Sequence, residues 1–217
     1  MIRQLPSWAE YGAFALAWIA GFINAIGLLS LEHQAVSHIS GTATEFGIAI
    51  WNLENDRLSH LGAILLSFLA GASLSGVLLS GTALQFGQQY ENVLSVEAVF
   101  LLFAFLLLRN NSHFGHYAAS LACGLQNAMV TSYSGAIVRT THLTGILTDL
   151  GLMLGARLRG EPFDQRKAVL FLLILLGFIL GAGCGAFAQQ KFGEGSLLVP
   201  SFMCLMMAMI YRISQRR

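Results

Sequence analysis

The chain has 217 residues; 55% of them are hydrophobic and only 11% are Asp, Glu, Lys or Arg. A soluble domain carries about 25% charged residues, so this chain has too few charges to cover a soluble fold of its size. Its net charge of +1 also leaves no basic face for nucleic acid. The composition therefore excludes an ordinary cytosolic enzyme, a disordered regulator and a nucleic-acid binder.

Long apolar runs predict an all-α protein, a polytopic transmembrane helical bundle. A spanning helix needs about 20 apolar residues. In chain order such runs cover residues 10–30, 61–81, 93–108, 114–133, 168–188 and 196–213, and the run at 114–133 is the mildest. Two shorter runs, 36–52 and 140–156, contain His, Ser, Thr and an acidic residue. They are expected either to span the membrane or to be half-helices broken at Gly41 and Gly145.

The distribution of positive charge bears on the topology, because Lys and Arg collect in cytoplasmic loops. If all eight segments cross and the N-terminus is cytoplasmic, only Arg139 and Lys191 of the 12 Lys and Arg lie outside. If the two short segments dip in and return on one side, Arg57, Arg109 and Lys191 lie outside instead. Both arrangements place the N- and C-termini in the cytoplasm.

The sequence contains an internal repeat. The pentapeptide GFINA at 21–25 recurs as GLQNA at 124–128, and HISGTATEFG at 38–47 recurs as HLTGILTDLG at 142–151. Phe68 and Gly71 recur as Phe178 and Gly181. The repeat predicts two homologous halves, residues 1–110 and 111–217, within one membrane domain. Four spans per half would give the halves one orientation, and three spans plus a re-entrant piece would invert them; both designs occur in secondary transporters.

Polar residues recur at matched positions of the two halves and predict a site between them. Ionisable side chains cost about 2.5–3.5 kcal/mol at the centre of a membrane, so a matched pair of them points to a function. The candidate substrate- or ion-binding residues are Asn24, His38, Ser40, Gly41, Thr44, Glu45, Gln126, Asn127, His142, Thr144, Gly145, Thr148 and Asp149. The alternative is that the glycines and hydroxyls only pack helices, and that the two acids lie shallow in ion pairs.

Glu97 and the glycine-rich run 177–185 give less specific signals. Glu97 is a lone acid in the run 93–108; it lies near the interface or, if deep, is a candidate carrier of protons or cations. Gly177, Gly181 and Gly185 have GxxxG spacing, which favours close packing of helices or a homodimer.

Neither a metal or cofactor site nor an active site is expected. Cys123, Cys184 and Cys204 lie far apart in apolar runs, as packed thiols do, and no ligand spacing for a metal is present. No motif that combines a nucleophile with a base is visible, so an enzyme is not expected.

Several of these motifs resemble the bacterial YoaK family, also known as DUF1275. The most similar parts are the GLQNA segment and the two His-x-Ser/Thr-Gly motifs, and the likeness covers nearly the whole chain. It marks Asn24, His38, Ser40, Gly41, Gln126, Asn127, His142, Thr144 and Gly145. Typical members read Thr-Gly-Asn where this chain has Ser40-Gly41-Thr42. The resemblance implies a protein of the bacterial inner membrane and implies no activity.

The sequence thus predicts a small-solute secondary transporter in the lipid bilayer, with a site between two repeats and with coupling to protons through His or carboxylate groups. The low charge of the spans favours a small substrate that is neutral or singly charged. The competing hypothesis is a scaffold, sensor or assembly subunit that transports nothing.

Overall fold

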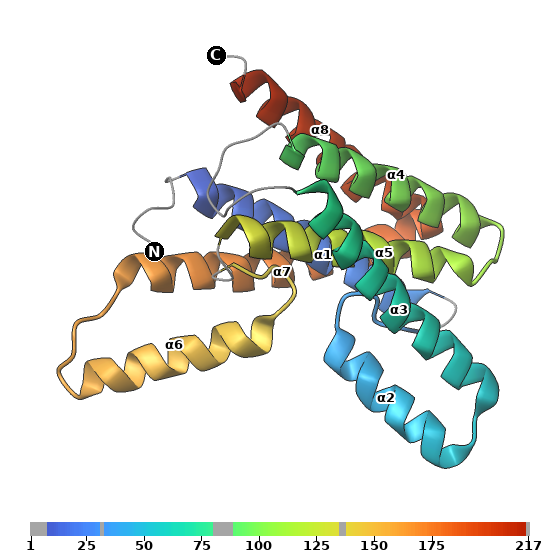
Figure 1. Cartoon of the computed structure of the whole chain (residues 1–217), viewed down its shortest axis with the longest axis horizontal. Coiled ribbons are helices and arrows are strands. Elements are labelled where there is room, and N and C mark those ends of the chain that lie inside the picture. Colours follow the sequence, from blue (N-terminus) through green and yellow to red (C-terminus); the bar gives the residue numbers. More distant parts are fainter. Residues whose placement is uncertain (1–7, 31–32, 80–88, 135–137, 216–217) are drawn as a thin grey trace.

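The computed structural model describes residues 8–30, 33–79, 89–134 and 138–215 of the chain (Figure 1). Arg3, Arg216 and Arg217, which entered the charge count, lie outside the described residues. Within those ranges the chain forms eight α-helices and a short 3-10 helix, with no strand. The prediction of an all-α helical membrane bundle is confirmed.

The helices follow one another through short connections. They are α1 (Trp8–Leu29), α2 (Ile39–Asn52), α3 (Asn55–Leu78), α4 (Gln89–Arg109), α5 (Phe114–Ser134), α6 (Leu143–Leu158), α7 (Gln165–Phe192) and α8 (Leu198–Gln215), with the 3-10 helix η2 (Gly193–Leu197) between the last two.

Among the described residues, four stretches are long and apolar enough to cross a membrane: Ala9–Leu29, Asn55–Leu78, Tyr90–Arg109 and Gln165–Ser214, the last of which contains both α7 and α8. The two short segments form unbroken helices of 14 and 16 residues. At 1.5 Å per residue, α2 and α6 are about 21 and 24 Å long, less than the roughly 30 Å of hydrocarbon in a bilayer. Gly41 and Gly145 do not break them, because each glycine lies in the first turn.

Helices α1 and α7 run parallel and in close contact. A Cβ atom built on any of three α7 glycines would collide with the backbone of α1. Along both helices in order, Gly177 lies against Phe14, Gly181 against Trp18 and Gly185 against Phe22. The GxxxG residues therefore pack helices within the chain, as small residues do in membranes. A homodimer through the glycine-rich helices stays a prediction.

Helices α3 and α5 repeat this crossing. Gly124 lies against Phe68 and Gly71 against Leu121, again with no room for a Cβ atom. The Ser120 hydroxyl donates to the Ile64 carbonyl at 3.0 Å, so this pair is parallel too. Residues that the sequence repeat pairs make equivalent contacts: Gly21 meets Phe178 as Gly124 meets Phe68.

The remaining helices are antiparallel to their neighbours. The end of α1 lies at the start of α5, where Ser30 and His116 are hydrogen-bonded at 2.6 Å. On α4 and α8, Ser201 donates to the Ala98 carbonyl at 2.9 Å, and Arg212 pairs with Glu91 at 3.9 Å. The described ends of the chain lie at the same end of the bundle, whose core is built mainly from α1, α4, α5 and α7 (Figure 1).

Candidate functional site

The chain turns back into the bundle after α1 and only then begins α2. The backbone N–H of Gln34 donates to the Gly27 carbonyl at 3.1 Å, and the backbone N–H of Ser37 donates to Asn24 Oδ1 at 3.2 Å. Residues 34–37 therefore retrace the last turns of α1, and α2 starts beside Asn24 rather than at the end of the bundle.

The second half makes the same turn after α5. The Thr140 hydroxyl donates to Gln126 Oε1 at 3.1 Å, and the Thr141 hydroxyl donates to Asn127 Oδ1 at 3.2 Å. Asn127 is the repeat equivalent of Asn24, so the two asparagines hold equivalent points of the two returning segments. Helices α2 and α6 begin close together in the middle of the bundle and diverge toward opposite ends (Figure 1).

A histidine precedes each of these helices, and a glycine lies under its ring. A Cβ atom on Gly41 would be 2.7 Å from His38 Cδ2, and one on Gly145 would overlap the His142 ring still more closely. The spacing of three residues allows each imidazole to fold back over the first turn of its helix. Both glycines are required for this close approach, and not for an unusual backbone angle.

A polar cavity of about 500 Å³ lies between the two helix starts. The first returning segment and α2 contribute Ser37, His38, Ile39 and Ser40; α3 contributes Phe68 and Ala72; α5 contributes Asn127, Ala128, Thr131 and Ser132; the second returning segment and α6 contribute Arg139, Thr141, His142 and Thr144. Hydroxyl, amide, imidazole and guanidinium groups thus converge from both halves of the chain.

Five of the thirteen residues predicted from the sequence line this cavity: His38, Ser40, Asn127, His142 and Thr144. Asn24 and Gln126 stand behind it and hold the returning segments. Gly41 and Gly145 lie under the histidine rings. The Thr44 and Thr148 hydroxyls donate to carbonyls of their own helices, those of Ser40 and Thr144, at 3.0 and 2.9 Å.

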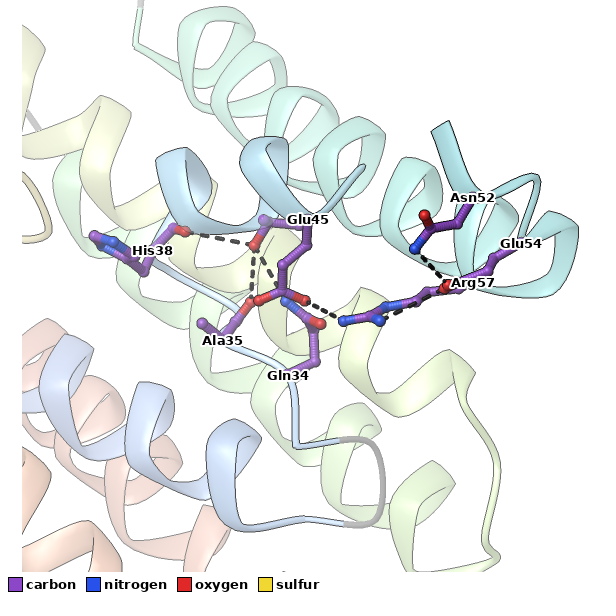
Figure 2. A network of polar contacts seen from close by, with 8 residues as sticks. Gln34, Ala35, His38, Glu45, Asn52, Glu54 and Arg57 are labelled. Carbon is purple, nitrogen blue, oxygen red and sulfur yellow. Dashed lines mark hydrogen bonds and ion pairs between the residues drawn. The ribbon is translucent and has the colours of Figure 1, made fainter. Parts of the chain in front are cut away.

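The two predicted acids are held in ion pairs away from the cavity. Glu45 pairs with Arg57 at 3.3 Å, and Asp149 approaches Lys167 at 3.9 Å. Figure 2 shows the Arg57 guanidinium between Glu45 and Glu54. Each pair ties one of the two short helices, α2 or α6, to the next helix in the chain. Neither carboxylate lines the cavity.

Glu97 is fully buried inside the bundle. Its Oε1 accepts a hydrogen bond from Gln126 Nε2 at 3.0 Å, and Gln126 in turn accepts from Thr140. This chain of side chains connects α4 with the second returning segment, one residue from the cavity-lining Thr141. Cys204 of α8 interacts with the same carboxyl group.

A second cavity, of about 620 Å³, is mainly apolar and contains none of the predicted site residues. The tyrosines of α4, α5 and α8 line it, with ring centroids of Tyr90 5.4 Å from Tyr133 and 6.0 Å from Tyr211. Across the described parts of the chain, no three His, Cys, Asp or Glu side chains gather as metal ligands. The polar cavity is therefore the better candidate for a functional site.

Sequence reasoning missed several lining residues. It used Arg139 only to count charges, and it did not single out Ser37, Thr131, Ser132 or Thr141. Ser37 and Thr141 directly precede the two repeated histidines, so their equivalent positions in the repeat could have marked them. Arg139 has Ala35 as its equivalent, and no repeat signal could have found it.

Comparison with known proteins identifies the family. A family model described as "Protein of unknown function (DUF1275)" matches residues 12–210. The UPF0700 transmembrane protein RA0705 of Rhizobium meliloti (strain 1021) is 31% identical over 204 residues, 93% of this chain and 86% of the relative. The UPF0700 transmembrane protein YoaK of Bacillus subtilis (strain 168) is 26% identical over 195 residues, 85% of this chain and 86% of the relative. No solved structure matches. With most of its length matched by the family model, this multi-pass membrane protein belongs to the DUF1275 family.

Proposed function

We propose that this protein is a small-solute permease whose substrate site is the central polar cavity. The observation that carries the proposal is that the first turns of α2 and α6 meet at this cavity. Interrupted helices that start at the membrane midplane are how many secondary transporters build their sites. Backbone that is not helical is tolerated at that depth where it lines a cavity.

We infer a topology of six crossings, made by α1, α3, α4, α5, α7 and α8, with α2 and α6 as half-helices. Because α1 and α5 run in opposite directions, the returning segments enter from opposite sides. The two halves are then inverted copies. This arrangement is the second of the two alternatives that the repeat left open.

We place the bundle in the bacterial inner membrane with both termini in the cytoplasm. The charged loop between α6 and α7 lies at the same end as the start of α1, since Arg166 pairs with Glu10 at 2.9 Å. Arg157 in the last turn of α6 and Arg159 directly after it lie at this end, and Lys167 follows Arg166. By the positive-inside rule this end faces the cytoplasm.

Swelling of proteoliposomes tests the permease. Purified protein is reconstituted, and the vesicles are moved into iso-osmotic solutions of small neutral solutes or of potassium salts with valinomycin to carry K⁺. At least one solute should swell the vesicles faster than protein-free liposomes. Ser40→Trp and Thr144→Trp, which fill the cavity, should abolish the difference. Ile48→Trp and Leu147→Trp are matched variants, because Ile48 and Leu147 are exposed on the same two helices.

Two results would contradict the permease. If vesicles with folded protein never swell faster than protein-free liposomes, the scaffold, sensor or assembly subunit is favoured. Swelling that survives both cavity-filling substitutions would move the route elsewhere in the bundle.

We further propose that any coupling to protons acts through His38 and His142. Histidine changes its charge near neutral pH, and these two line the cavity whereas Glu45 and Asp149 do not. The pH profile of solute flux should change in the double variant His38→Asn/His142→Asn. The profile should be kept in Glu45→Gln/Asp149→Asn. The opposite pattern would return the coupling to the carboxylates.

A further inference from the structure

The lining of the central cavity is rich in hydrogen-bond donors and holds no carboxylate from the described residues. We propose that the cavity binds a small oxyanion, such as nitrate or a short-chain carboxylate. This inference rests on the cavity used for the proposed permease, and names its ligand class. It does not depend on whether the ligand is transported.

Two helix N-termini supply the first part of the argument. The first amide groups of a helix lack partners within it, and each N-terminus carries about half a positive charge. The residues that directly precede α2 and α6 are His38 and His142, and their side chains make no capping hydrogen bond to these amide groups. The first turns of both helices line the same cavity, through Ile39 and Ser40 of α2 and Thr144 of α6.

Ser37 is the second, independent observation. Its side chain is 3% exposed and lines the cavity, yet its Oγ has no hydrogen-bond partner among the described residues. A buried hydroxyl without a partner is costly. The hydroxyl of its repeat equivalent, Thr141, does have a partner, because it donates to Asn127 Oδ1. The Ser37 hydroxyl is thus left to donate to a molecule inside the cavity.

Arg139 and Asn127 complete the set of donors. Arg139 brings a permanent positive charge to the lining. Asn127 accepts from Thr141 through Oδ1, which leaves its NH₂ group to donate.

The charges around the site favour an anion over a cation or a neutral solute. One guanidinium and two helix ends carry about two positive charges in all. The nearest acids on the half-helices, Glu45 and Asp149, are neutralised by Arg57 and Lys167 and do not cancel this field. A cavity of about 500 Å³ fits an ion of a few heavy atoms together with water. A cation would meet the positive ends of both helices, and a neutral solute would leave the guanidinium without a counter-charge.

Thermal unfolding of the detergent-purified full chain tests the proposal. Sodium nitrate, formate and acetate replace sodium gluconate at constant ionic strength, and acetamide is the neutral analogue of acetate. At least one of the three small anions should raise Tm in a saturable way, and acetamide should not. Arg139→Gln should weaken the apparent Kd about 10- to 100-fold, as loss of a charge-assisted hydrogen bond does. Arg157→Gln, which changes an exposed residue in the last turn of α6, should leave Kd unchanged.

Ser37→Ala keeps the proposal testable if Arg139→Gln fails to fold. This variant should also weaken anion binding while leaving the protein without anion at least as stable as the wild type. Equal stabilisation by acetamide, no stabilisation by any of the three anions, or unchanged Kd in Ser37→Ala and in folded Arg139→Gln would each overturn the anion site. If the protein binds an anion but the vesicles do not swell, the permease fails and the anion site stands. If neutral solutes swell the vesicles and no anion binds, the anion site fails and the permease stands.

Discussion

The segments that lead into α2 and α6 reach equivalent positions through different bonds. In the first, Thr42 is fully buried and links Gln34 to the Ala35 carbonyl. Its repeat equivalent is the buried, apolar Ile146. In the second, Gln126 holds Thr140 and reaches Glu97, whereas the equivalent of Gln126 is Ile23.

This difference separates what shapes the cavity from what gives it chemical character. Histidine and glycine recur in both halves and form both helix starts. Arg139, the unpartnered Ser37 hydroxyl and the Glu97–Gln126 pair each occur on one side only. A pair of matched backbones therefore borders a cavity whose charge comes mainly from the second half.

The largest effect is expected for Gln126→Leu. The substitution leaves the buried Glu97 carboxyl and the Thr140 hydroxyl without their partner, which should cost about 2–3 kcal/mol of unfolding free energy. Unfolding in mixed micelles measures it. Ile23→Leu at the equivalent position should cost under about 1.5 kcal/mol. Equal losses would mean that the second segment does not depend on its polar anchor.

Gly145→Ala should be next in size. The new Cβ atom pushes the His142 ring from its position, at a strain of about 1–1.5 kcal/mol. Gly151 lies on the same helix, and a Cβ atom added there would have no neighbouring atom within 4 Å. Gly151→Ala should therefore stabilise the protein through helix propensity alone. The difference in Tm between the two variants measures the strain. Gly41→Ala, compared with Gly47→Ala on α2, should lower Tm by less than Gly145→Ala does, because the new Cβ atom overlaps the His38 ring less closely. A larger loss of Tm in Gly41→Ala than in Gly145→Ala would argue against the two ring positions.

Thr42→Val tests the anchor of the first segment. Removing the hydroxyl leaves the Gln34 amide group buried without that partner, and should cost about 1 kcal/mol. Thr44→Val on the exposed face should change the unfolding free energy by less than about 0.5 kcal/mol. If Thr42→Val is as neutral as Thr44→Val, the polar link is not what holds the first segment.

The smallest effect, with the opposite sign, is expected for Ser37→Ala. Removing a buried, unpartnered hydroxyl should stabilise the anion-free protein by about 0.5 kcal/mol. The equivalent change, Thr141→Val, removes a satisfied hydrogen bond and should destabilise it. Thermal unfolding in gluconate compares the two variants, and destabilisation by both would mean that Ser37 already has a partner.

Much of the fold could be predicted from the sequence because the bilayer restricts the choices. Segment positions followed from apolar length, and the GxxxG contacts from glycine spacing. The repeat predicted a site lined by both halves, and His38 and His142 both line the central cavity. The depth of Glu97 could not be predicted, since an acid eight residues into α4 is compatible with either the interface or the interior.

The candidate site was less predictable for a different reason. A helical projection places His38, Gly41 and Glu45 on one face. That projection does not reveal that Arg57, on the next helix, lies close enough to pair with Glu45. Nor does it reveal that α2 begins directly after His38, so that residues before the helix, rather than its later turns, line the cavity. Long-range contacts of this kind leave no periodic pattern.

The crossing of α1 with α7 has a consequence for biosynthesis. The surface of α1 around Trp18 and Phe22 is covered by Gly181 and Gly185, which leave the ribosome more than a hundred residues later. Until then the first helix must reside in the membrane with lipid, or with the insertion machinery, against that surface. The bundle can close only after α7 has been inserted, so a chain truncated after α5 would contain the first helix but not its main partner.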